Sequence, residues 1–262
     1  MYDDETLAFV DHRIEELAIR VTYNPVQHSG LVVVNLSYVP NGLLTQALNE
    51  LQMTCDAHLN PSRLVRIVPS GSKKPILYGP DKTHIEYEIP KNYTAVFTLC
   101  SATIVGLLVQ NKIPVRPIGG GVVEVVDNVP RRFTHMIRYD ATTIDPLLVL
   151  ISQETTSLHQ IMQTGSGNLL ASVHACHMEA ETEVGRILDM IPRWYSGILD
   201  IGLPNIPLLG IPLDSRYFGI ATLGGTNWLA ALAEKNISAI TYAMKGLLDI
   251  TDLEILPGGV ED

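Results

Sequence analysis

Cysteine is scarce in this chain. Only three occur in 262 residues, at Cys55, Cys100 and Cys176. Three thiols cannot build the set of paired bridges that stabilises small secreted domains, which excludes that class. The first residues, MYDDETLAFVDHR, are acidic and contain no apolar core, so they do not have the features of a secretory signal. We therefore expect an intracellular protein in reducing surroundings, located in the cytoplasm.

Positive charge and long apolar runs are also scarce. The chain has 18 lysines and arginines against 28 aspartates and glutamates, which gives a formal net charge of −10. An acidic surface repels the phosphate backbone, so we expect no specific DNA binding by this chain itself. No apolar run approaches the ~20 residues that span a bilayer, so we expect no membrane partner.

Complete catalytic and cofactor motifs are missing. No G-x-S-x-G sequence surrounds Ser101, and the sequence marks none of the histidines as a base for Cys100. The stretch HACHME, residues 174–179, has no C-x-x-C partner for a metal, and IGGGVV, residues 118–123, lacks the spacing of a phosphate loop. The sequence thus predicts no enzyme, no metal site and no cofactor. A hydrolase that uses Cys100 or Asp145 is the alternative among enzymes.

What the chain does contain is typical of an ordered globular protein, with 46% apolar and 18% charged residues. Near its start, apolar residues recur at spacings of three and four, at Leu7, Val10, Ile14, Leu17 and Val21. This spacing predicts an amphipathic helix with a narrow, coiled-coil-like stripe. The stripe either packs on its own domain or forms a dimer seam or a connection to an upstream segment. We assign residues 1–28 to this connector helix.

The same order of a strand followed by a helix is predicted twice. LVVVNLSYV is a predicted strand followed by the predicted helix NGLLTQALNELQ, and GNLLASVHA is followed by MEAETEVGRILDMI. Residues 30–35 align with residues 167–172 without a gap. Further along, residues 101–113 align with residues 225–237, again without a gap. The match rests on pattern rather than identity, so chance similarity between strand–helix elements is the alternative.

This pattern predicts an α+β or α/β fold made of internally duplicated strand–helix units. The units lie near residues 29–128 and 166–254, within one domain from 29 to 262. Between them, the segment 129–165 is polar and includes an Asp-Pro pair, which is typical of a loop. The densest polar cluster of the chain is in this segment: Arg131, Arg132, His135, Arg138, Tyr139, Thr142, Thr143 and Asp145.

Two predicted helix starts are candidates for an anion site. Cys100 and Ser101 precede one apolar run, and the hydroxyl of Ser101 or Thr103 is suited to cap that helix. Gly224–Gly225 and Asn227 open the matching run. A helix start carries partial positive charge and accepts carboxylates, so two of them with a nearby arginine suit a small dianion. Ordinary capping without a ligand is the alternative.

Taken in order, several segments resemble the NrpR regulatory domain, the effector-sensing module of the archaeal nitrogen repressor. The resemblance runs from about residue 29 to residue 256 and is carried by GLVVVNLSYV, CSATIVGLLVQNKIPV, GGVVEV, RFTHMIRYDATTIDPL, GILDIGLPNIPLLGIPL and GGTNWLAALAEKNI. It implies a repressor of nitrogen-assimilation genes that releases DNA when 2-oxoglutarate accumulates. It also implies a homodimer or higher homo-oligomer. DNA contact is then expected only through a winged-helix domain absent from this chain, which would be a fragment or a separate subunit.

The resemblance also assigns site residues. We expect the helix start at Cys100–Ser101 to face a pocket lined by Arg132 and the segment from Tyr139 to Asp145. Ser101 and Thr103 would donate to one carboxylate of the effector, and Arg132 or Arg138 would pair with the other. The full expected set is Cys100, Ser101, Thr103, Arg132, Arg138, Tyr139, Thr142, Thr143, Asp145, Gly224, Gly225 and Asn227.

Two positions depart from the family pattern. The sequence Ser172-Val173-His174-Ala175 stands where family members often have Ser-Phe-Arg-Glu, and Trp228 stands in place of the usual proline. Arginine binds a carboxylate through two parallel hydrogen bonds, so its replacement implies weaker or altered sensing. The alternative function is therefore a ligand-independent assembly or co-repressor subunit of the same family.

Overall fold

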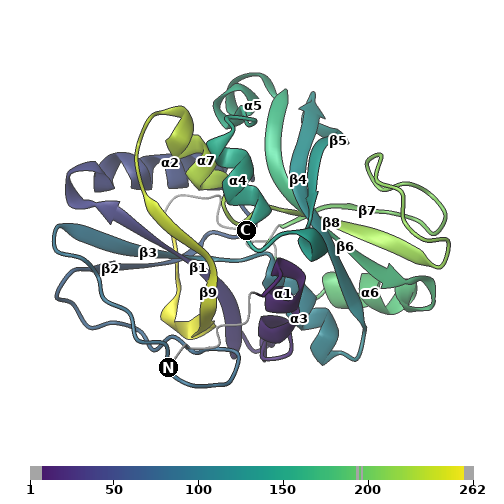
Figure 1. The fold of residues 1–262 in the computed structure, drawn as a ribbon, viewed down its shortest axis with the longest axis horizontal. Helices are drawn as coiled ribbons and strands as arrows, with labels where there is room; N and C mark the ends of the chain where they lie inside the picture. The colour runs from purple at the N-terminus through teal and green to yellow at the C-terminus, as the bar shows by residue number, and fades with distance from the viewer. Residues whose placement is uncertain (1–7, 193–194, 196, 257–262) are drawn as a thin grey trace.

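The computed structural model describes residues 8–192, 195 and 197–256. Its strands form two five-stranded sheets, in which every strand pair is antiparallel. Seven α-helices accompany the sheets in this part of the chain. The fold is therefore α+β, since an α/β fold requires parallel strands. Figure 1 shows the two sheets side by side along the longest axis.

The first sheet has the strand order β10-β2-β3-β1-β9. Its inner strand LVVVNLSYVP, which lies between β3 and β9, is buried except at its two ends, and this suits its many β-branched residues. Two helices pack together on one face of this sheet, where Leu51 and Trp228 meet Val39 and Val96. The elements are β1 (Leu31–Pro40), α2 (Leu44–Asp56), β2 (Leu64–Pro69), β3 (Tyr93–Leu99), α7 (Asn227–Glu234), β9 (Ile240–Asp249) and β10 (Glu254–Ile255).

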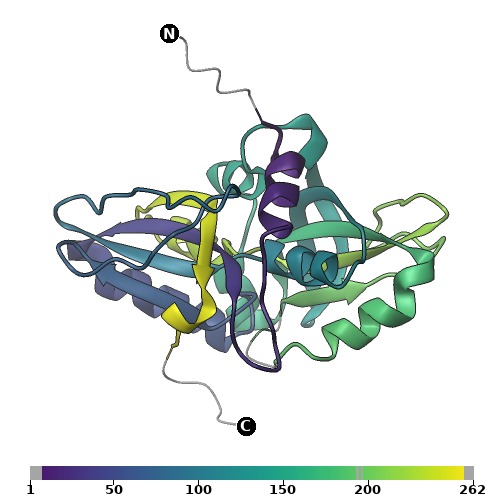
Figure 2. The same ribbon diagram turned by 90° about the horizontal axis from the view of Figure 1, so that it is seen from below.

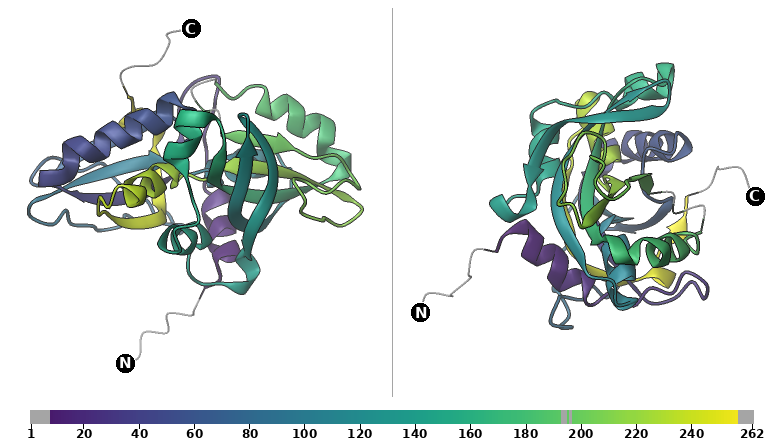
Figure 3. Two further views of the ribbon diagram at one scale, coloured as in Figure 1. Left: turned by 90° about the horizontal axis from the view of Figure 1, so that it is seen from above. Right: turned by 90° about the vertical axis from the view of Figure 1, so that its right-hand side faces the viewer.

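The second sheet has the order β5-β4-β6-β8-β7. Its central strand, GNLLASVHACH, is likewise buried over most of its length. The side chains of Ile104 and Ile187 pack with Phe218 and Ile220 of the sheet. The elements are α3 (Ala102–Gln110), β4 (Val115–Val126), β5 (Val129–Arg138), β6 (Gly167–His177), α6 (Glu181–Leu188), β7 (Ile198–Ile201) and β8 (Tyr217–Leu223). Helices α2 and α6 lie on the same side of the molecule, one over each sheet (Figures 2 and 3).

Shorter elements complete the chain. Helices α4 (Pro146–Ser152) and α5 (Leu158–Thr164) connect β5 to β6, and both contact α7. Four 3₁₀ turns follow β1, β5, β6 and β9: η1 (Asn41–Leu43), η2 (Tyr139–Ala141), η3 (Met178–Ala180) and η4 (Ile250–Asp252). Among the described residues, no helix combines the length and the apolar character needed to cross a bilayer.

The chain crosses from one sheet to the other at two equivalent points. Strand β3 belongs to the first sheet, but the next elements, α3 and β4, pack on or join the second. Strand β8 belongs to the second sheet, but α7 and β9 pack on or join the first. Each sheet is thus completed by a helix and a strand from the other half of the chain. Both helix starts singled out in the sequence lie at these crossings.

Matching hydrogen bonds hold the two helix starts. The backbone N–H of Cys100 donates to the Val33 carbonyl at 2.9 Å, and that of Gly224 donates to the Leu170 carbonyl at 2.8 Å. The Val33 N–H donates to Thr103 Oγ1 at 3.0 Å. In the other half, the Leu170 N–H donates to Asn227 Oδ1 at 2.8 Å. Thr103 and Asn227 therefore have the same structural role, since the side-chain oxygen of each accepts a hydrogen bond from the backbone of a strand.

The two helices also end alike. The Ile113 N–H donates to the Leu108 carbonyl at 3.1 Å, and the Ile237 N–H donates to the Leu232 carbonyl at 2.9 Å. The residue before each isoleucine has a positive φ, 66° at Lys112 and 57° at Asn236. These equivalences follow the ungapped alignment of residues 101–113 with 225–237. They support an internal duplication with units near 29–128 and 166–254, which we propose as the origin of the fold.

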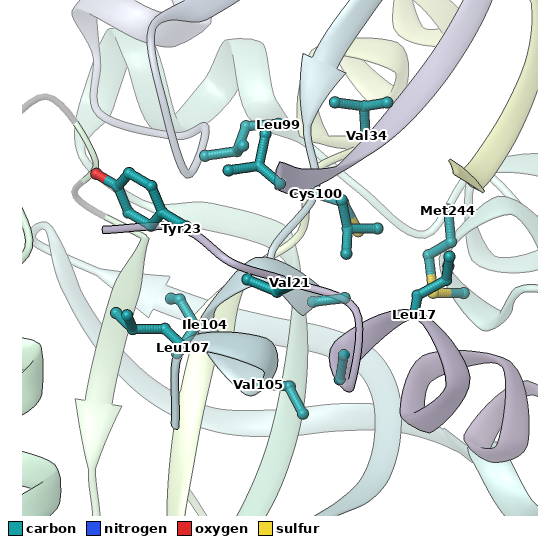
Figure 4. Close-up of a cluster of buried hydrophobic side chains, with 14 of the residues drawn as sticks. Leu17, Val21, Tyr23, Val34, Leu99, Cys100, Ile104, Val105, Leu107 and Met244 are labelled. Atoms are coloured by element: carbon teal, nitrogen blue, oxygen red, sulfur yellow. The ribbon is translucent and has the colours of Figure 1, made fainter. Parts of the chain in front are cut away.

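The amphipathic stripe near the start of the chain packs on its own domain. Helix α1 covers Val10–Ala18, and Val10, Ile14, Leu17 and Val21 are all buried. The remaining stripe residue, Leu7, lies outside the described residues. Helix α1 lies between the two sheets on the side opposite α2 and α6 (Figures 2 and 3). Figure 4 shows Leu17 beside Met244 of β9 and Val21 beside α3.

The close packing against α3 depends on a glycine. A Cβ atom added at Gly106 would lie 2.3 Å from Val21 Cγ2 and 3.0 Å from the Ala18 carbonyl oxygen. We expect Gly106→Ala to lower the free energy of unfolding by about 1–3 kcal/mol, as overpacked cores do. Gly185 in α6 is the matched control, because an added Cβ meets no atom within 4 Å there. Gly185→Ala should raise stability by about 0.5–1 kcal/mol. Urea denaturation of both variants checks this, and equal shifts would contradict the packing.

Candidate ligand-binding site

A small enclosed cavity lies where the chain crosses between the two sheets. Elements from both halves contribute to it: α1, β1, the start of α3, η2, the start of α4, β6, the start of α7 and β9. Its lining residues are Ile14, Asn35, Cys100, Ser101, Ala102, Tyr139, Asp145, Leu147, Ser172, His174, Gly225, Thr226, Ala243 and Met244. Neither half of the chain forms this cavity alone.

The two crossings touch each other at Gly225. A Cβ atom added there would lie 2.8 Å from Asn35 Nδ2 and 3.0 Å from the Leu99 carbonyl oxygen. The Asn35 side chain joins the crossing to β9, since Nδ2 donates to the Gly225 carbonyl at 3.3 Å and Oδ1 accepts from the Met244 N–H at 3.0 Å. Glycine is needed here because the backbone of one crossing leaves no room for a side chain on the other.

Neither helix start is capped by the side chain of its own N-cap residue, although at α7 the Trp228 N–H donates to Asn60 Oδ1 at 3.1 Å. Ser101 is the N-cap residue of α3 and Thr226 that of α7, but neither side chain accepts a capping hydrogen bond. The expected cap by Ser101 or Thr103 is therefore wrong. The reason is that Thr103 Oγ1 is taken by the backbone of β1, while Ser101 lies against the cavity. No N-cap side chain therefore offsets the partial positive charge of either helix start, and at α7 Asn60 takes up one of the N–H groups.

Buried polar side chains surround the cavity. The Tyr139 hydroxyl donates to Ser172 Oγ at 2.8 Å, and the Tyr139 ring stacks on the His174 ring with centroids 6.5 Å apart. Asp145 accepts from the backbone N–H groups of Leu147 and Leu148 at 2.9 and 3.2 Å, which caps α4. Burial raises the pKa of Asp145 above its ordinary value, and it also raises the pKa of Tyr139.

Cys100 is not an activated nucleophile. Burial raises the pKa of its thiol to about 12, so the thiol stays protonated near neutral pH. The thiolate is the reactive form of cysteine, and here burial disfavours it. The hydrolase alternative thus lacks its proposed nucleophile at this position.

One positive charge acts on the cavity from α1. Arg13 is exposed, and its Nη2 atom donates to the Met244 carbonyl at 3.1 Å. Burial is the largest influence on the pKa of Asp145 and of Cys100, and the charge of Arg13 lowers both pKa values in part. Arg13 therefore belongs to the electrostatic surroundings of the cavity.

The expected site residues fall into three groups. Cys100, Ser101, Tyr139, Asp145 and Gly225 line the cavity. Gly224, Thr103 and Asn227 lie directly behind it and hold the two helix starts to β1 and β6. The others, Arg132, Arg138, Thr142 and Thr143, do not line the cavity.

The expectation that Arg132 or Arg138 lines the pocket is wrong for this structure. Both lie on β5, the edge strand of the second sheet, and their side chains are exposed. Arg132 Nε donates to Glu124 Oε2 at 3.0 Å, and Arg138 pairs with Asp140. The Thr142 hydroxyl bonds to the backbone of Ile144 instead. The dense polarity of this segment reflects solvent exposure.

The expected set of site residues omitted Asn35, Ser172 and His174, which line the cavity, and Arg13, whose charge acts on it from α1. The first two carried a signal, because they are polar residues at the matching ends of the aligned stretches 30–35 and 167–172. Both sit in strands that are otherwise largely apolar, where an unpartnered polar group is costly. His174 carried the same signal two residues after Ser172, on the same face of β6.

The cavity is closed in this structure. The volume open to the centre of a water molecule is about 20 Å³, enough for about one water. Pockets for small ligands have volumes of roughly 300–1,000 Å³. A metabolite therefore requires the lining side chains or the two sheets to move apart.

These features belong to a regulatory domain. Residues 7–255 match the family model described as "NrpR regulatory domains NRD1 and 2". The chain belongs to this family of nitrogen-regulator domains, as the resemblance in its sequence predicted. The family is one of nitrogen regulators and not of enzymes.

The chain is similar to three curated nitrogen regulators. It is 32% identical to the global nitrogen regulator NrpRI of Methanosarcina mazei, over 94% of this chain and 72% of that protein. It is 27% identical to the global nitrogen regulator NrpR of Methanococcus maripaludis, over 89% of this chain. For NrpR of Methanocaldococcus jannaschii the identity is 26% over 90% of this chain. The chain spans only 38% of each of these two longer regulators.

A solved structure has the same fold. The crystal structure of a nitrogen repressor-like protein from Methanococcus jannaschii matches with a TM-score of 0.77. It is 24% identical in sequence and is covered over 98% of its length by 95% of this chain. At this identity the likeness establishes the fold alone.

Proposed function

We propose that this chain is the effector-sensing and oligomerisation domain of a repressor of nitrogen-assimilation genes. Its effector is 2-oxoglutarate or a similar small dianion, bound in the cavity between the two helix starts. The observation that carries the proposal is this closed cavity with polar lining residues, built at two helix starts whose N-cap side chains make no capping hydrogen bond, in a chain of a nitrogen-regulator family. In this proposal the protein is cytoplasmic, carries no cofactor and catalyses no reaction.

The cavity offers a plausible chemistry for such a ligand. One carboxylate would lie against the starts of α3 and α7, where the helix dipoles favour negative charge. Ser101 and Ser172 supply hydroxyl groups beside it, and Arg13 supplies positive charge from α1. A charge-assisted hydrogen bond contributes about 1.5–3 kcal/mol. Two or three of them, offset by ordering costs, correspond to roughly micromolar to millimolar dissociation constants.

The closed cavity also suggests how a signal arises. A ligand shifts a protein only toward the arrangement that it binds better. Because the cavity has room for about one water, the effector would favour an arrangement in which the two sheets are further apart. In a homodimer or higher homo-oligomer, that change would alter the spacing of DNA-binding domains. We place DNA contact in a winged-helix domain outside this chain.

The second candidate is a ligand-independent assembly or co-repressor subunit of the same family. Two observations favour it: the small volume of the cavity, and His174 in place of the arginine expected from the family pattern. In this function, the cavity would remain closed and the domain would only join subunits.

Titration calorimetry with 2-oxoglutarate separates the two candidates. We expect saturable binding of one ligand per chain with a dissociation constant between about 1 µM and 1 mM. Glutarate, which has the same five-carbon chain but lacks the 2-oxo group, is the matched control for dicarboxylates in general. Absence of any binding heat up to tens of millimolar ligand would favour the assembly subunit.

A further inference from the structure

His174 is a buried polar side chain without a partner. It is 2% exposed, and neither Nδ1 nor Nε2 has a hydrogen-bond partner among the described residues. Its neighbours on the flanking strands, Pro117 and Ile220, carry no charge. The ring lines the cavity, with Tyr139 stacked on it and Ser172 on the same face of β6. An imidazole needs a donor or an acceptor when buried, so this arrangement is costly unless something enters the cavity.

Other titratable groups lie around His174. Those that line the cavity are Cys100, Tyr139 and Asp145. Burial raises the pKa of all three, which keeps the thiol and the phenol uncharged near neutral pH. The positive charge that acts on Cys100 and Asp145 comes from Arg13. A dianion that enters the cavity therefore carries more negative charge than the single positive charge of Arg13 can balance.

We propose that His174 takes up a proton when a carboxylate ligand binds in the cavity, so that effector binding is coupled to pH. The proton comes from solvent and adds to the free ring nitrogen. The resulting imidazolium donates a hydrogen bond to the ligand carboxylate, and no covalent bond changes. His174 then supplies, only in the bound state, the positive charge that an arginine would carry permanently. This inference rests on the proposed function and assigns one residue a role within it.

The coupling has a definite sign. In the empty cavity, burial lowers the pKa of His174 to about 4, so the ring is neutral at physiological pH. A carboxylate within hydrogen-bond distance raises the pKa of its partner by about 1–3 units. Binding thus takes up protons in the window between the free and bound pKa values. Affinity should rise as pH falls through this window, by up to about tenfold per unit, and should be constant well above it.

Calorimetry in two buffers of different ionisation enthalpy, such as Mes and bis-Tris, tests the inference at about pH 6, which is well above the ordinary pKa values of carboxyl groups. The wild-type chain should take up a measurable fraction of one proton per ligand. His174→Gln keeps a polar side chain of similar length but cannot gain the charge, so it should bind without proton uptake. Asp145→Asn retains an oxygen that caps α4 and should keep the uptake.

The outcomes distinguish the two proposals. Binding of 2-oxoglutarate with no buffer dependence would overturn the role of His174 and leave the proposed function intact. The same holds if Asp145→Asn, rather than His174→Gln, removes the proton uptake. Failure of the wild-type chain to bind 2-oxoglutarate would overturn the proposed function and, with it, this inference. Thermal unfolding of the unliganded variants shows whether each is folded.

Discussion

Asn227→Ala should lower the free energy of unfolding by about 3 kcal/mol, because it removes the partners of two buried backbone groups at about 1–3 kcal/mol each. Asn227 is completely buried. Its Oδ1 accepts from the Leu170 N–H at 2.8 Å, and its Nδ2 donates to the Leu59 carbonyl at 2.7 Å and to the Leu170 carbonyl at 3.1 Å. These bonds hold the start of α7 to β6 and to the loop after α2.

Asn111→Ala is the matched control. This asparagine stands at the end of α3, is only partly buried, and donates one bond to the Leu107 carbonyl at 2.8 Å. Its loss should cost no more than about 1 kcal/mol. Differential scanning calorimetry measures both, with melting temperature falling by about 2–4 °C per kcal/mol in a domain of this size. If the two variants have the same melting temperature, Asn227 does not hold the crossing, and its place in a ligand site must be reconsidered.

Arg13→Ala should weaken 2-oxoglutarate binding about tenfold while leaving the unliganded fold intact. The reason is that Arg13 is exposed on α1, yet its charge acts on Asp145 and Cys100 inside the cavity. In the variant, a dianion in the cavity is no longer attracted by the positive charge of Arg13.

Arg132→Ala is the control for the loss of an arginine as such. Arg132 is also exposed and pairs with Glu124 at 3.0 Å, but it does not line the cavity. Its removal should change affinity by less than about twofold, since surface ion pairs contribute little. Calorimetric titration of both variants is the measurement. A larger loss in Arg132→Ala than in Arg13→Ala would restore the site expected from the sequence pattern.

The sequence made the helix starts visible because each lies between an apolar strand and an apolar helix. Cys100–Ser101 and Gly224–Gly225 were therefore recognisable before the structure was known, and the structure brings both to one cavity. The repeated strand–helix pattern also predicted an α+β or α/β fold, and the structure is α+β. These are features of local periodicity and of segment order, which a single sequence carries.

The exchange of elements between the sheets was not predictable in this way. Local pattern assigns α3 to its own unit, and only tertiary packing shows that it lies on the second sheet. For the same reason, the sequence predicted Arg132 in the ligand pocket, whereas it is exposed on β5. Its segment is rich in polar residues because β5 is an edge strand, and nothing in the local pattern separates an exposed edge from a ligand pocket.

The most direct test of the cavity as the effector site is a crystal structure of the chain at saturating 2-oxoglutarate. The account predicts ligand density between the starts of α3 and α7, with one carboxylate within hydrogen-bond distance of Ser101 and of the His174 ring. It also predicts that the cavity has expanded well beyond its present volume of about 20 Å³. Ligand bound instead in the outer groove beside Arg138 and Arg116, with the cavity still closed, would contradict it.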